Sequence, residues 1–283
     1  MADEQSGGLL GDAPDRSYGD KLERYERFLE PELRALIADL EIAPGARILD
    51  AGCGVGLVTR WLAETTGRTG SVVGVDLSHG HIEAAERLNG TRELPLRFMQ
   101  ADITRTIFGP GTFDLIWTYN TINHLDDPAA ALQTLAQTVV SEGRVVLVQD
   151  LLLPEMIFAW DERLEQAVVR ACRAYYRDKY GLSHRQITNQ RNIYGWMLQA
   201  GFERVELRTV VSERVQPLSD TDIDYFQHSV FEGHWGERVQ PYLEDEDWQE
   251  LVRLTDPESD EYALKRPDFY ALQTCTVVTG HVA

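Results

Sequence analysis

Three glycines at alternate positions, Gly52, Gly54 and Gly56, form the segment whose residue types point most directly to chemistry. They follow a short apolar run that ends at Asp50, and an apolar, helix-like segment begins at Leu57. Glycine lets the backbone turn tightly and approach a ligand without a Cβ in the way. A strand that ends in such a turn and continues as a helix is typical of a nucleotide-binding site.

The residue after this turn separates two kinds of nucleotide site. A dinucleotide fingerprint, G-x-G-x-x-G, requires glycine at position 57, where the chain has Leu57. In a dinucleotide fold the pyrophosphate lies on the helix N-terminus, and the third glycine allows the helix to pack closely beside it. Leu57 therefore argues against an NAD site. Because a glycine turn alone is a weak signal, the neighbouring residues must decide the ligand.

Polar residues also follow the next three predicted strands. The segment 71–76 reads as a buried parallel strand that ends in Asp76, a carboxylate suited to accept both ribose hydroxyls of an adenosine. This feature occurs in nicotinamide-binding folds too, so it indicates adenosine without selecting the cofactor. The other strand-end residues are Asp102, Ile103, Tyr119, Asn120 and the tripeptide Asn123-His124-Leu125.

Taken in order between residues 46 and 150, these features resemble class I S-adenosylmethionine (SAM) dependent methyltransferases. The segment Ile48-Leu49-Asp50 with its glycine turn resembles motif I of that family, and a strand-end His-Leu is common in members that act on small molecules. The resemblance implies SAM as cofactor, and it places Asp102 where an acidic side chain meets the adenine amino group. The cofactor-binding residues that we expect are Tyr18, Asp50, Gly52, Gly54, Gly56, Asp76, Leu77, Asp102, Ile103, Tyr119 and Asn120.

Each of these residues also has a purely structural interpretation. Asp76 and Asp102 suit ordinary loops, because Asp favours turns, although the whole series favours ligand contact. For Asp50, holding the glycine turn competes almost equally with direct contact to the ligand amine. Cys53, between two glycines and with no base partner in sight, reads as a small packed residue and not as a nucleophile.

The chain alternates predicted strands and helices, which specifies an α/β fold: a Rossmann-like, doubly wound seven-stranded sheet with helical cap insertions. By resemblance, six strands are parallel and the last, at 270–280, is antiparallel between the fifth and the sixth. A helix at 20–40, bent at Pro31, precedes the sheet. The other strands are expected at 46–51, 71–76, 95–99, 112–118, 143–150 and 203–212, and the helices at 56–66, 79–88, 127–140, 155–180 and 189–200.

Two segments depart from a minimal domain of this kind and predict a helical cap over the methyl group. Their aromatic residues suggest an apolar pocket for a flat or hydrophobic molecule, although cap core or a homodimer interface would use the same residues. The expected substrate-binding residues are Trp160, Tyr175, Tyr176, Tyr225, His228 and Trp235. The expected units are 1–40, an N-terminal segment and helix; 41–153, the SAM-binding core; 154–188, the first cap insertion; 189–216, more core; 217–266, the second cap insertion; and 267–283, the final strand.

Methyl transfer from a sulfonium requires a nucleophilic atom held in line with the sulfur–methyl bond, about 3 Å away, with water excluded. A base is needed only when the nucleophile carries a proton. His124 is the leading candidate, by its place in the resembled family and because imidazole titrates near neutrality, although a loop histidine bonded to the backbone is an equal alternative. Asp150 and Tyr25 are further catalytic candidates, and His228 and His234 are weaker ones.

Composition favours a cytoplasmic enzyme. The net charge of −19, from 46 acidic and 27 basic residues, repels polyanions and argues against nucleic acid as partner. The N-terminus has no basic and apolar leader, and no run approaches membrane-spanning length. Three widely spaced cysteines indicate neither a disulfide framework nor a zinc site, and we expect no metal.

Three hypotheses follow from these observations. The first is a methyltransferase that uses SAM to methylate oxygen, nitrogen or carbon of a small aromatic or alkaloid-like molecule, in bacterial specialised metabolism. The second is a non-catalytic SAM-binding regulator or partner subunit. The third is an NAD-dependent oxidoreductase, against which Leu57 and the lack of a hydride-transfer constellation both argue.

Overall fold

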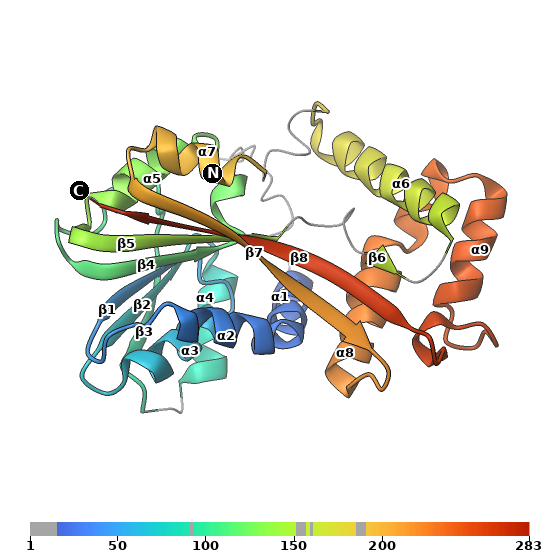
Figure 1. Ribbon diagram of the computed structural model, residues 1–283, viewed down its shortest axis with the longest axis horizontal. Helices are drawn as coiled ribbons and strands as arrows, with labels where there is room; N and C mark the ends of the chain where they lie inside the picture. The colour runs from blue at the N-terminus through green and yellow to red at the C-terminus, as the bar shows by residue number, and fades with distance from the viewer. Residues whose placement is uncertain (1–15, 91–92, 151–156, 159–160, 185–190, 283) are drawn as a thin grey trace, which may run out of the picture.

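The protein is built around a twisted sheet, and its parallel strands come from the N-terminal half of the chain. The computed structural model describes residues 16–90, 93–150, 157–158, 161–184 and 191–282 (Figure 1). Strands with apolar, buried interiors pair in parallel in the order β3-β2-β1-β4-β5. Their bounds are β1 Arg47–Ala51, β2 Ser71–Asp76, β3 Leu96–Gln100, β4 Phe113–Tyr119 and β5 Val139–Asp150. The strand order reverses between β1 and β4, which places a ligand crevice at their carboxyl ends.

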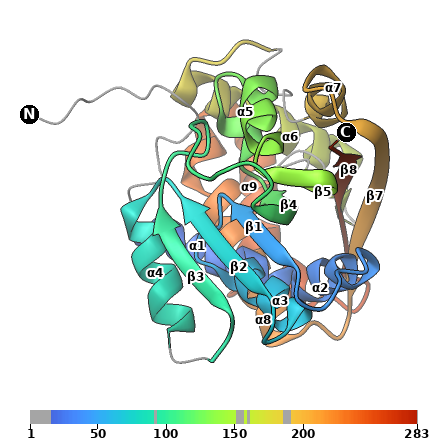
Figure 2. The same cartoon turned by 90° about the vertical axis from the view of Figure 1, so that its left-hand side faces the viewer.

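Helices cover both faces of this sheet (Figure 2). On one face lie α2 (Glu30–Asp39), α3 (Leu57–Thr66) and α4 (His79–Asn89), whose buried side chains share a core with Ile48, Trp117 and Val146. On the other lie α5 (Pro128–Ala136) and α7 (Ile193–Gln199), which share a second core with Ile116 and Val145. Successive strand residues point to opposite faces, so adjacent positions such as Val145 and Val146 enter different cores.

The last strand lies at its expected position, between the fifth strand and the strand at 203–212. β8 (Tyr270–His281) is antiparallel to β5 on one side and to β7 (Glu203–Val215) on the other, so the predicted seven-stranded sheet is confirmed. A two-residue strand that we did not expect, β6 (Ile157–Phe158), also pairs with β8. β5 pairs with β8 only as far as Cys275, whereas β7 pairs with it to Tyr270. β7 and β8 thus run beyond the parallel sheet as a two-stranded arm (Figure 1).

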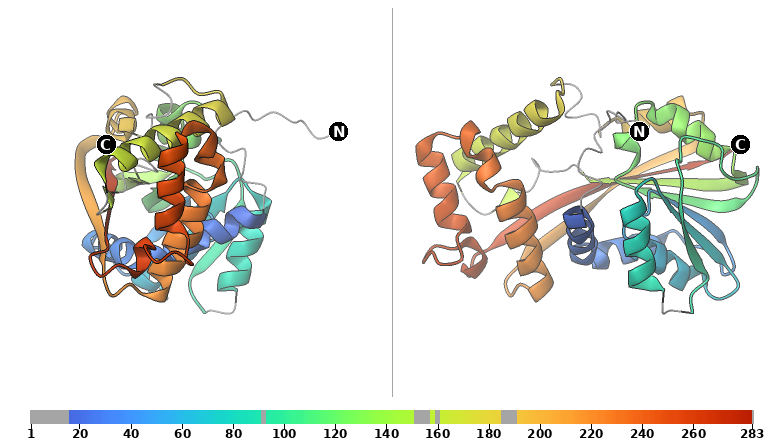
Figure 3. Two further views of the ribbon diagram at one scale, coloured as in Figure 1. Left: turned by 90° about the vertical axis from the view of Figure 1, so that its right-hand side faces the viewer. Right: turned by 180° about the vertical axis from the view of Figure 1, so that it is seen from behind.

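A helical lobe gathers at the far end of this arm (Figures 1 and 3). Apolar residues of its helices, including Leu164, Phe231 and Leu251, are fully or almost fully buried, and they join the α2–α4 core in one continuous cluster. The lobe comprises α6 (Glu162–Tyr180), α8 (Asp220–Asp224), η3 (Tyr225–His234), η4 (Glu237–Tyr242), α9 (Asp245–Thr255) and η5 (Ala263–Lys265).

The expected helix at 20–40 is two helices, α1 (Arg16–Phe28) and α2, with Leu29 between them. Pro31 lies in the first turn of α2, where a missing N–H removes no helical hydrogen bond, so it begins a helix and does not bend one. α1 lies between the sheet and the lobe (Figures 1 and 3), and its Phe28 stacks on Tyr225 of η3 with 4.0 Å between ring centroids.

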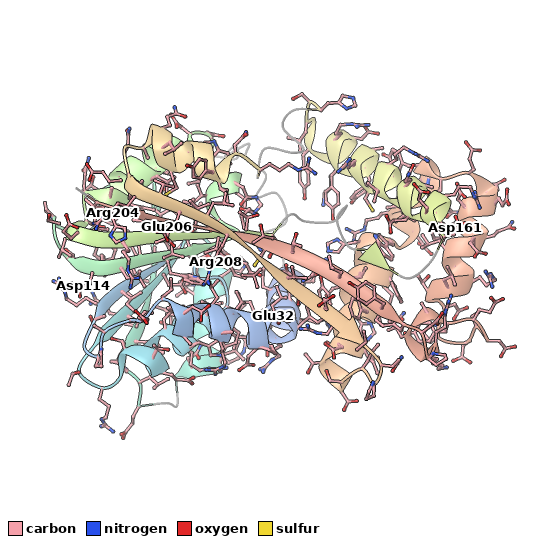
Figure 4. The ribbon with its side chains drawn as sticks, in the orientation of Figure 1. Glu32, Asp114, Asp161, Arg204, Glu206 and Arg208 are labelled. Atoms are coloured by element: carbon pink, nitrogen blue, oxygen red, sulfur yellow. The ribbon has the colours of Figure 1, made fainter. Side chains whose placement is uncertain are left out.

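Polar contacts fix α2 and the neighbouring strand β7 to each other. The Arg208 guanidinium lies 2.9 Å from Asp39, and Arg214 lies 2.6 Å from Glu32, a residue labelled with Arg208 in Figure 4. Arg214 also donates to Asp222 of α8 at 2.7 Å and to the Phe28 carbonyl at 2.7 Å. One guanidinium therefore joins α1, α2, the arm and the lobe.

Two predicted boundaries are wrong for local reasons. The helix expected at 127–140 ends at Ala136, because the chain enters β5 at Val139, and a register shift opposite Phe113 and Leu115 accommodates the extra residues. The helix expected from 155 begins at Glu162, where the Asp161 side chain accepts the backbone N–H of Leu164 and caps it. Within the described residues, no helix combines the length and apolar character needed to cross a membrane.

Candidate functional site

The glycine turn joins β1 to α3 with all three glycines in the left-handed region, at φ of 83°, 52° and 78°. A Cβ on Gly52 would lie 2.1 Å from Thr121 Oγ1, and one on Gly56 would lie 2.6 Å from the Phe98 ring. The protein itself therefore requires glycine at these two positions. At Gly54 the nearest atoms belong to α1, at 3.3 Å in Leu22 and 3.6 Å in Glu26, so this glycine faces the N-terminal helix.

Asp76, at the end of β2, holds the turn from the side. Its carboxylate accepts the Gly54 N–H at 3.0 Å and the Ser78 N–H at 2.8 Å, and His81 Nδ1 lies 3.2 Å away. The next residue, Leu77, is half exposed at the crevice side of the strand end. The structure thus brings Asp76 and the glycine turn together, as the sequence predicts, with Asp76 serving the turn as well.

Asp102 lies in the loop after β3 and also serves its own loop. It accepts the Thr104 N–H at 2.9 Å and the Thr104 hydroxyl at 2.6 Å, and Arg105 lies 3.2 Å away. Partial burial acts to raise the pKa of Asp102, but the bonds from Thr104 and the Arg105 charge outweigh it and hold the pKa below its usual value. The adjacent Ile103 is buried in the second core. Contact with adenine stays a prediction for both residues.

Two buried carboxylates meet beneath the turn. Asp50 is 1% exposed and accepts the Thr59 hydroxyl at 2.6 Å, and burial raises its pKa to about 7. Glu26 of α1 is 6% exposed; burial and then the Asp50 charge raise its pKa well above the usual value, while the Leu57 N–H acts to lower it. Glu26 is not among the site residues predicted from the sequence. The available signal was a carboxylate at a position that continues the apolar spacing of Leu22 and Leu29.

A second polar cluster forms around Asp150 at the carboxyl end of β5. This carboxylate is 4% exposed and accepts hydrogen bonds from the Tyr119 hydroxyl at 2.8 Å, from Asn120 Nδ2 and from the Tyr25 hydroxyl. Asn120 has a positive φ of 50° and accepts the Asp150 N–H at 2.9 Å. Residues of α1, β4 and the loop after β4 therefore converge on the Asp150 side chain at the end of β5.

The electrostatics of this cluster keep its phenols protonated. Burial raises the pKa of Asp150, although the three hydrogen bonds act to lower it. Burial and then the Asp150 charge raise the pKa of Tyr25 and Tyr119 well above the usual value, so both hydroxyls are donors at neutral pH. Tyr225 of η3 closes the cluster, with its ring centroid 5.5 Å from that of Tyr25.

His124 ends the short 3₁₀ turn η1 (Ile122–His124) that follows β4. Burial lowers the pKa of this histidine, although the hydrogen bond to the Asn120 carbonyl acts in the other direction. The imidazole is therefore neutral at pH 7, and its buried Nδ1 has no hydrogen-bond partner among the described residues. This geometry is compatible with both interpretations of His124, the general base and the loop histidine bonded to the backbone. One ring nitrogen bonds the backbone, and the other keeps a lone pair.

The predicted substrate residues fall into different environments. Tyr225 joins the Asp150 cluster, whereas Trp235 stacks on Phe231 inside the lobe, with 5.7 Å between centroids. Tyr175 and Tyr176 lie partly buried on α6, where the Tyr176 hydroxyl lies 3.3 Å from Nδ1 of His234. Burial lowers the pKa of His234 to about 3.

Three further predicted residues are exposed or lack a described side chain. His228 is exposed and its Nδ1 lies 2.8 Å from Glu232, so it is not brought to either cluster. Trp160 lies outside the described residues, and Tyr18 lies within α1 without a described side chain. In the part of the chain that the structure describes, no group of three or more His, Cys, Asp or Glu side chains could hold a metal ion.

Comparisons with known proteins match this arrangement. A family model described as "Methyltransferase domain" matches residues 25–207. The 2-phytyl-1,4-naphtoquinone methyltransferase of Thermosynechococcus vestitus is 31% identical over 176 residues, which cover 59% of this chain and 76% of that protein. Methyltransferase GfsG of Streptomyces halstedii is 32% identical over 138 residues, and the match spans 47% of each chain, less than half of that relative's length.

A solved structure shares the fold over almost the whole chain. Phosphoethanolamine N-methyltransferase 2 of Haemonchus contortus, in complex with phosphomonomethylethanolamine and S-adenosylhomocysteine, superposes with a TM-score of 0.57 at 16% identity. The superposition covers 98% of this chain and 60% of that one. At this level of identity the likeness establishes the Rossmann-like fold and nothing finer.

Proposed function

The chain belongs to the family of SAM-dependent methyltransferases, and on that premise we propose that it methylates an oxygen, nitrogen or carbon atom of a small molecule. The acceptor that we propose is aromatic or alkaloid-like, and the setting is bacterial specialised metabolism. A relative and a structural neighbour support a small acceptor, because their names specify a naphthoquinone and a phosphoethanolamine. NAD chemistry is no longer supported, since Leu57 and the family assignment agree.

The residues present fit SAM on three observations. Gly54 places no side chain at the turn, Asp76 ends the neighbouring strand with a carboxylate that ribose hydroxyls would suit, and a buried oxygen of Glu26 lacks a partner within the described chain. The missing side chain at Gly54 would let the cofactor approach the turn. Asp76 suits the ribose of SAM, and Glu26 suits its charged amino-acid tail. We assign the cofactor to this crevice on that basis.

The Asp150 cluster is the observation that carries the proposed acceptor site. When bound, SAM supplies an activated methyl group on a sulfonium. The protein must hold the acceptor atom in line with that methyl group and keep water out. Asp150 and Tyr119 are buried at the carboxyl ends of β5 and β4, Tyr25 of α1 packs partly buried against them, and their mutual hydrogen bonds fix where each can touch an acceptor.

Two groups are proposed to take the acceptor's proton. His124 is neutral and keeps a lone pair on Nδ1, as a general base requires. Asp150 has a pKa raised by burial, which makes the carboxylate a stronger base than an exposed aspartate. Tyr25, which donates to Asp150, is proposed to touch the acceptor and to orient it.

Among oxygen, nitrogen and carbon acceptors, the cluster favours nitrogen. Within the described residues, Asp150 has no arginine or lysine as an ion-pair partner; the hydroxyls of Tyr25 and Tyr119 donate to it, and the rings of Tyr25, Tyr119 and Tyr225 pack beside one another next to it. A buried carboxylate with aromatic walls suits a cationic amine, through charge pairing and cation–π attraction. The aromatic walls also suit a flat acceptor.

Methyl transfer from labelled SAM to matched sets of amines, phenols and indoles tests this function. We expect labelled product, with the amines that carry an aromatic ring giving the highest kcat/KM. Product from phenols or indoles alone would contradict the nitrogen assignment. Binding of S-adenosylhomocysteine without labelled product from any set would favour the non-catalytic regulator instead.

The two proposed bases are separated by substitution. His124→Ala should leave the affinity for S-adenosylhomocysteine unchanged and lower turnover, because only the proton acceptor is lost. An unchanged turnover in this variant would remove His124 as the base and leave Asp150. His228→Ala is the matched control, because that imidazole is exposed and away from both clusters.

A further inference from the structure

Glu26 places a carboxylate on the buried side of α1, against the glycine turn. A Cβ on Gly54 would lie 3.6 Å from Glu26 Oε1, so the absence of that Cβ leaves a gap between the turn and the carboxylate. Glu26 is 6% exposed and comes from a helix that precedes the sheet in the chain. The glutamate of a helix is rarely buried in this way unless it is paired.

One oxygen of Glu26 is left without a partner. Burial raises the pKa of this carboxyl, and the Leu57 N–H bond acts against the rise. The other oxygen, Oε2, is buried with no hydrogen-bond partner among the described residues. A buried acceptor without a donor costs about 1–3 kcal/mol, so the position suits a donor that arrives with a ligand.

The charges around Glu26 are mostly negative. Asp50 on β1 and Glu23 on α1 both act to raise the pKa of Glu26, and Asp76 on β2 adds to the field at Asp50. The Arg60 guanidinium on α3 acts in the opposite direction. Glu23 has its own cation, Arg27, at 2.7 Å, whereas Glu26, Asp50 and Asp76 lie around the turn with Arg60 as the guanidinium that acts on Glu26, so the site favours a further cation with N–H donors.

We propose that Glu26 receives the ammonium group of the methionine tail of SAM, with Asp50 on the other side of that group. An ammonium carries three N–H donors and one positive charge, so it supplies both a donor for Oε2 and compensation for the carboxylate pair. Because Glu26 belongs to α1, cofactor binding would strengthen the docking of α1 on the sheet.

This proposal concerns the cofactor and is independent of which acceptor is methylated. It is tested by calorimetric titration of Glu26→Gln with S-adenosylhomocysteine and with the analogue in which hydrogen replaces the amino group. A hydrogen bond to a charged group contributes about 1.5–3 kcal/mol, so we expect Kd for S-adenosylhomocysteine to rise roughly 10- to 100-fold. The analogue without the amino group should bind wild type and Glu26→Gln with the same Kd.

The matched control is Asp20→Asn, which removes an exposed carboxylate from the same helix, α1. It should leave both affinities unchanged. An equal loss of both ligands in Glu26→Gln would show a structural role, and an unchanged Kd for S-adenosylhomocysteine would also overturn the proposal. Glu26→Asp, which keeps the charge on a shorter side chain, should give an intermediate loss for S-adenosylhomocysteine alone.

Hydrogen exchange gives a readout that does not depend on the affinity itself. At saturating S-adenosylhomocysteine the amides of α1 should gain protection in wild type, and much less in Glu26→Gln at the same occupancy. The analogue without the amino group should protect α1 weakly in both proteins. Equal protection of α1 by both ligands in wild type would mean that the ammonium does not dock this helix, contrary to the proposal.

Discussion

The glycine turn and the Asp150 cluster lie at the same end of the sheet but are assembled in different ways. The turn takes its groups from the segment 50–57 and from Asp76 on the next strand. The Asp150 cluster takes its groups from α1, β4, β5 and η3, over a sequence distance of two hundred residues. The glycine turn is thus assembled mostly from residues close together in the sequence, whereas the Asp150 cluster depends on tertiary packing.

The largest effect is expected where the turn meets Thr121, in the loop after β4. Gly52→Ala combines a left-handed backbone with a Cβ 2.1 Å from Thr121, and we expect about 2–5 kcal/mol of destabilisation from strain and overpacking together. Gly67→Ala is the control, because it has a φ of 73° with nothing within 4 Å, and it should lose only the strain. Urea unfolding measures both; equal losses would mean that the contact with Thr121 is unimportant.

In the proposed acceptor site, Asp150→Asn should change turnover much more than cofactor affinity. It removes the charge that Tyr25, Tyr119 and Asn120 surround, and loss of a general base or cation partner lowers kcat by about 100-fold or more. Titration with S-adenosylhomocysteine should give an unchanged Kd. If Asp150→Asn instead lost the cofactor and kept kcat at saturation, the division between the two sites would be wrong.

The sheet and the lobe should respond to pH with opposite signs. Asp50 has a folded pKa of about 7, raised by burial above its unfolded value, so its contribution is fully present at low pH and is lost as pH rises toward 7. His234 has a folded pKa lowered by burial to about 3, so its contribution is present above about pH 6.5 and is lost as pH falls.

Substitutions separate these two contributions. Each slope amounts to about 1.4 kcal/mol per pH unit at most. Asp50→Asn should remove the decrease in stability between about pH 4 and 7, and His234→Gln should remove the increase between about pH 4 and 6. Urea midpoints across this range measure both, and slopes of the same sign in the two variants would contradict the assignment.

The smallest effect is expected at His228, which the sequence groups with the substrate residues and the structure leaves exposed beside Glu232. His228→Ala should change the free energy of unfolding by less than about 0.5 kcal/mol, as surface substitutions usually do. KM for the acceptor should also be unchanged. An increase in KM with kcat intact would show that η3 presents this face to the acceptor.

The sequence predicts the sheet and the turn well because both depend on short-range patterns. Apolar runs that end in Asp50 and Asp76 define the strands, and β8 lies between β5 and β7 as expected. Glu26 could not be predicted in this way, because a lone carboxylate on a helix is solvent-exposed by default and packing of α1 against the glycine turn buries it. The bulge in β5 depends on its partner strand and has no local signature.

The sequence also could not predict which aromatic residues of the lobe face the sheet. Aromatic spacing along α6 and η3 predicts which residues are apolar, but it does not tell which ring faces the sheet. Tyr225 reaches Asp150's neighbours, while Trp235, ten residues later, fills the interior of the lobe. The rotation of η3 about its axis decides which ring faces the sheet, and tertiary packing fixes that rotation.

The arm formed by β7 and β8 has a mechanical consequence. Their pairing runs unbroken from Glu206 to Val215, so no residue along it is free to absorb the backbone rotation that a hinge requires. The lobe therefore cannot swing open at a single joint, and bending must be spread over the whole ribbon. We therefore expect entry and exit of a molecule as large as the cofactor to involve α1, which lies against the turn through Glu26 and against Asp150 through Tyr25.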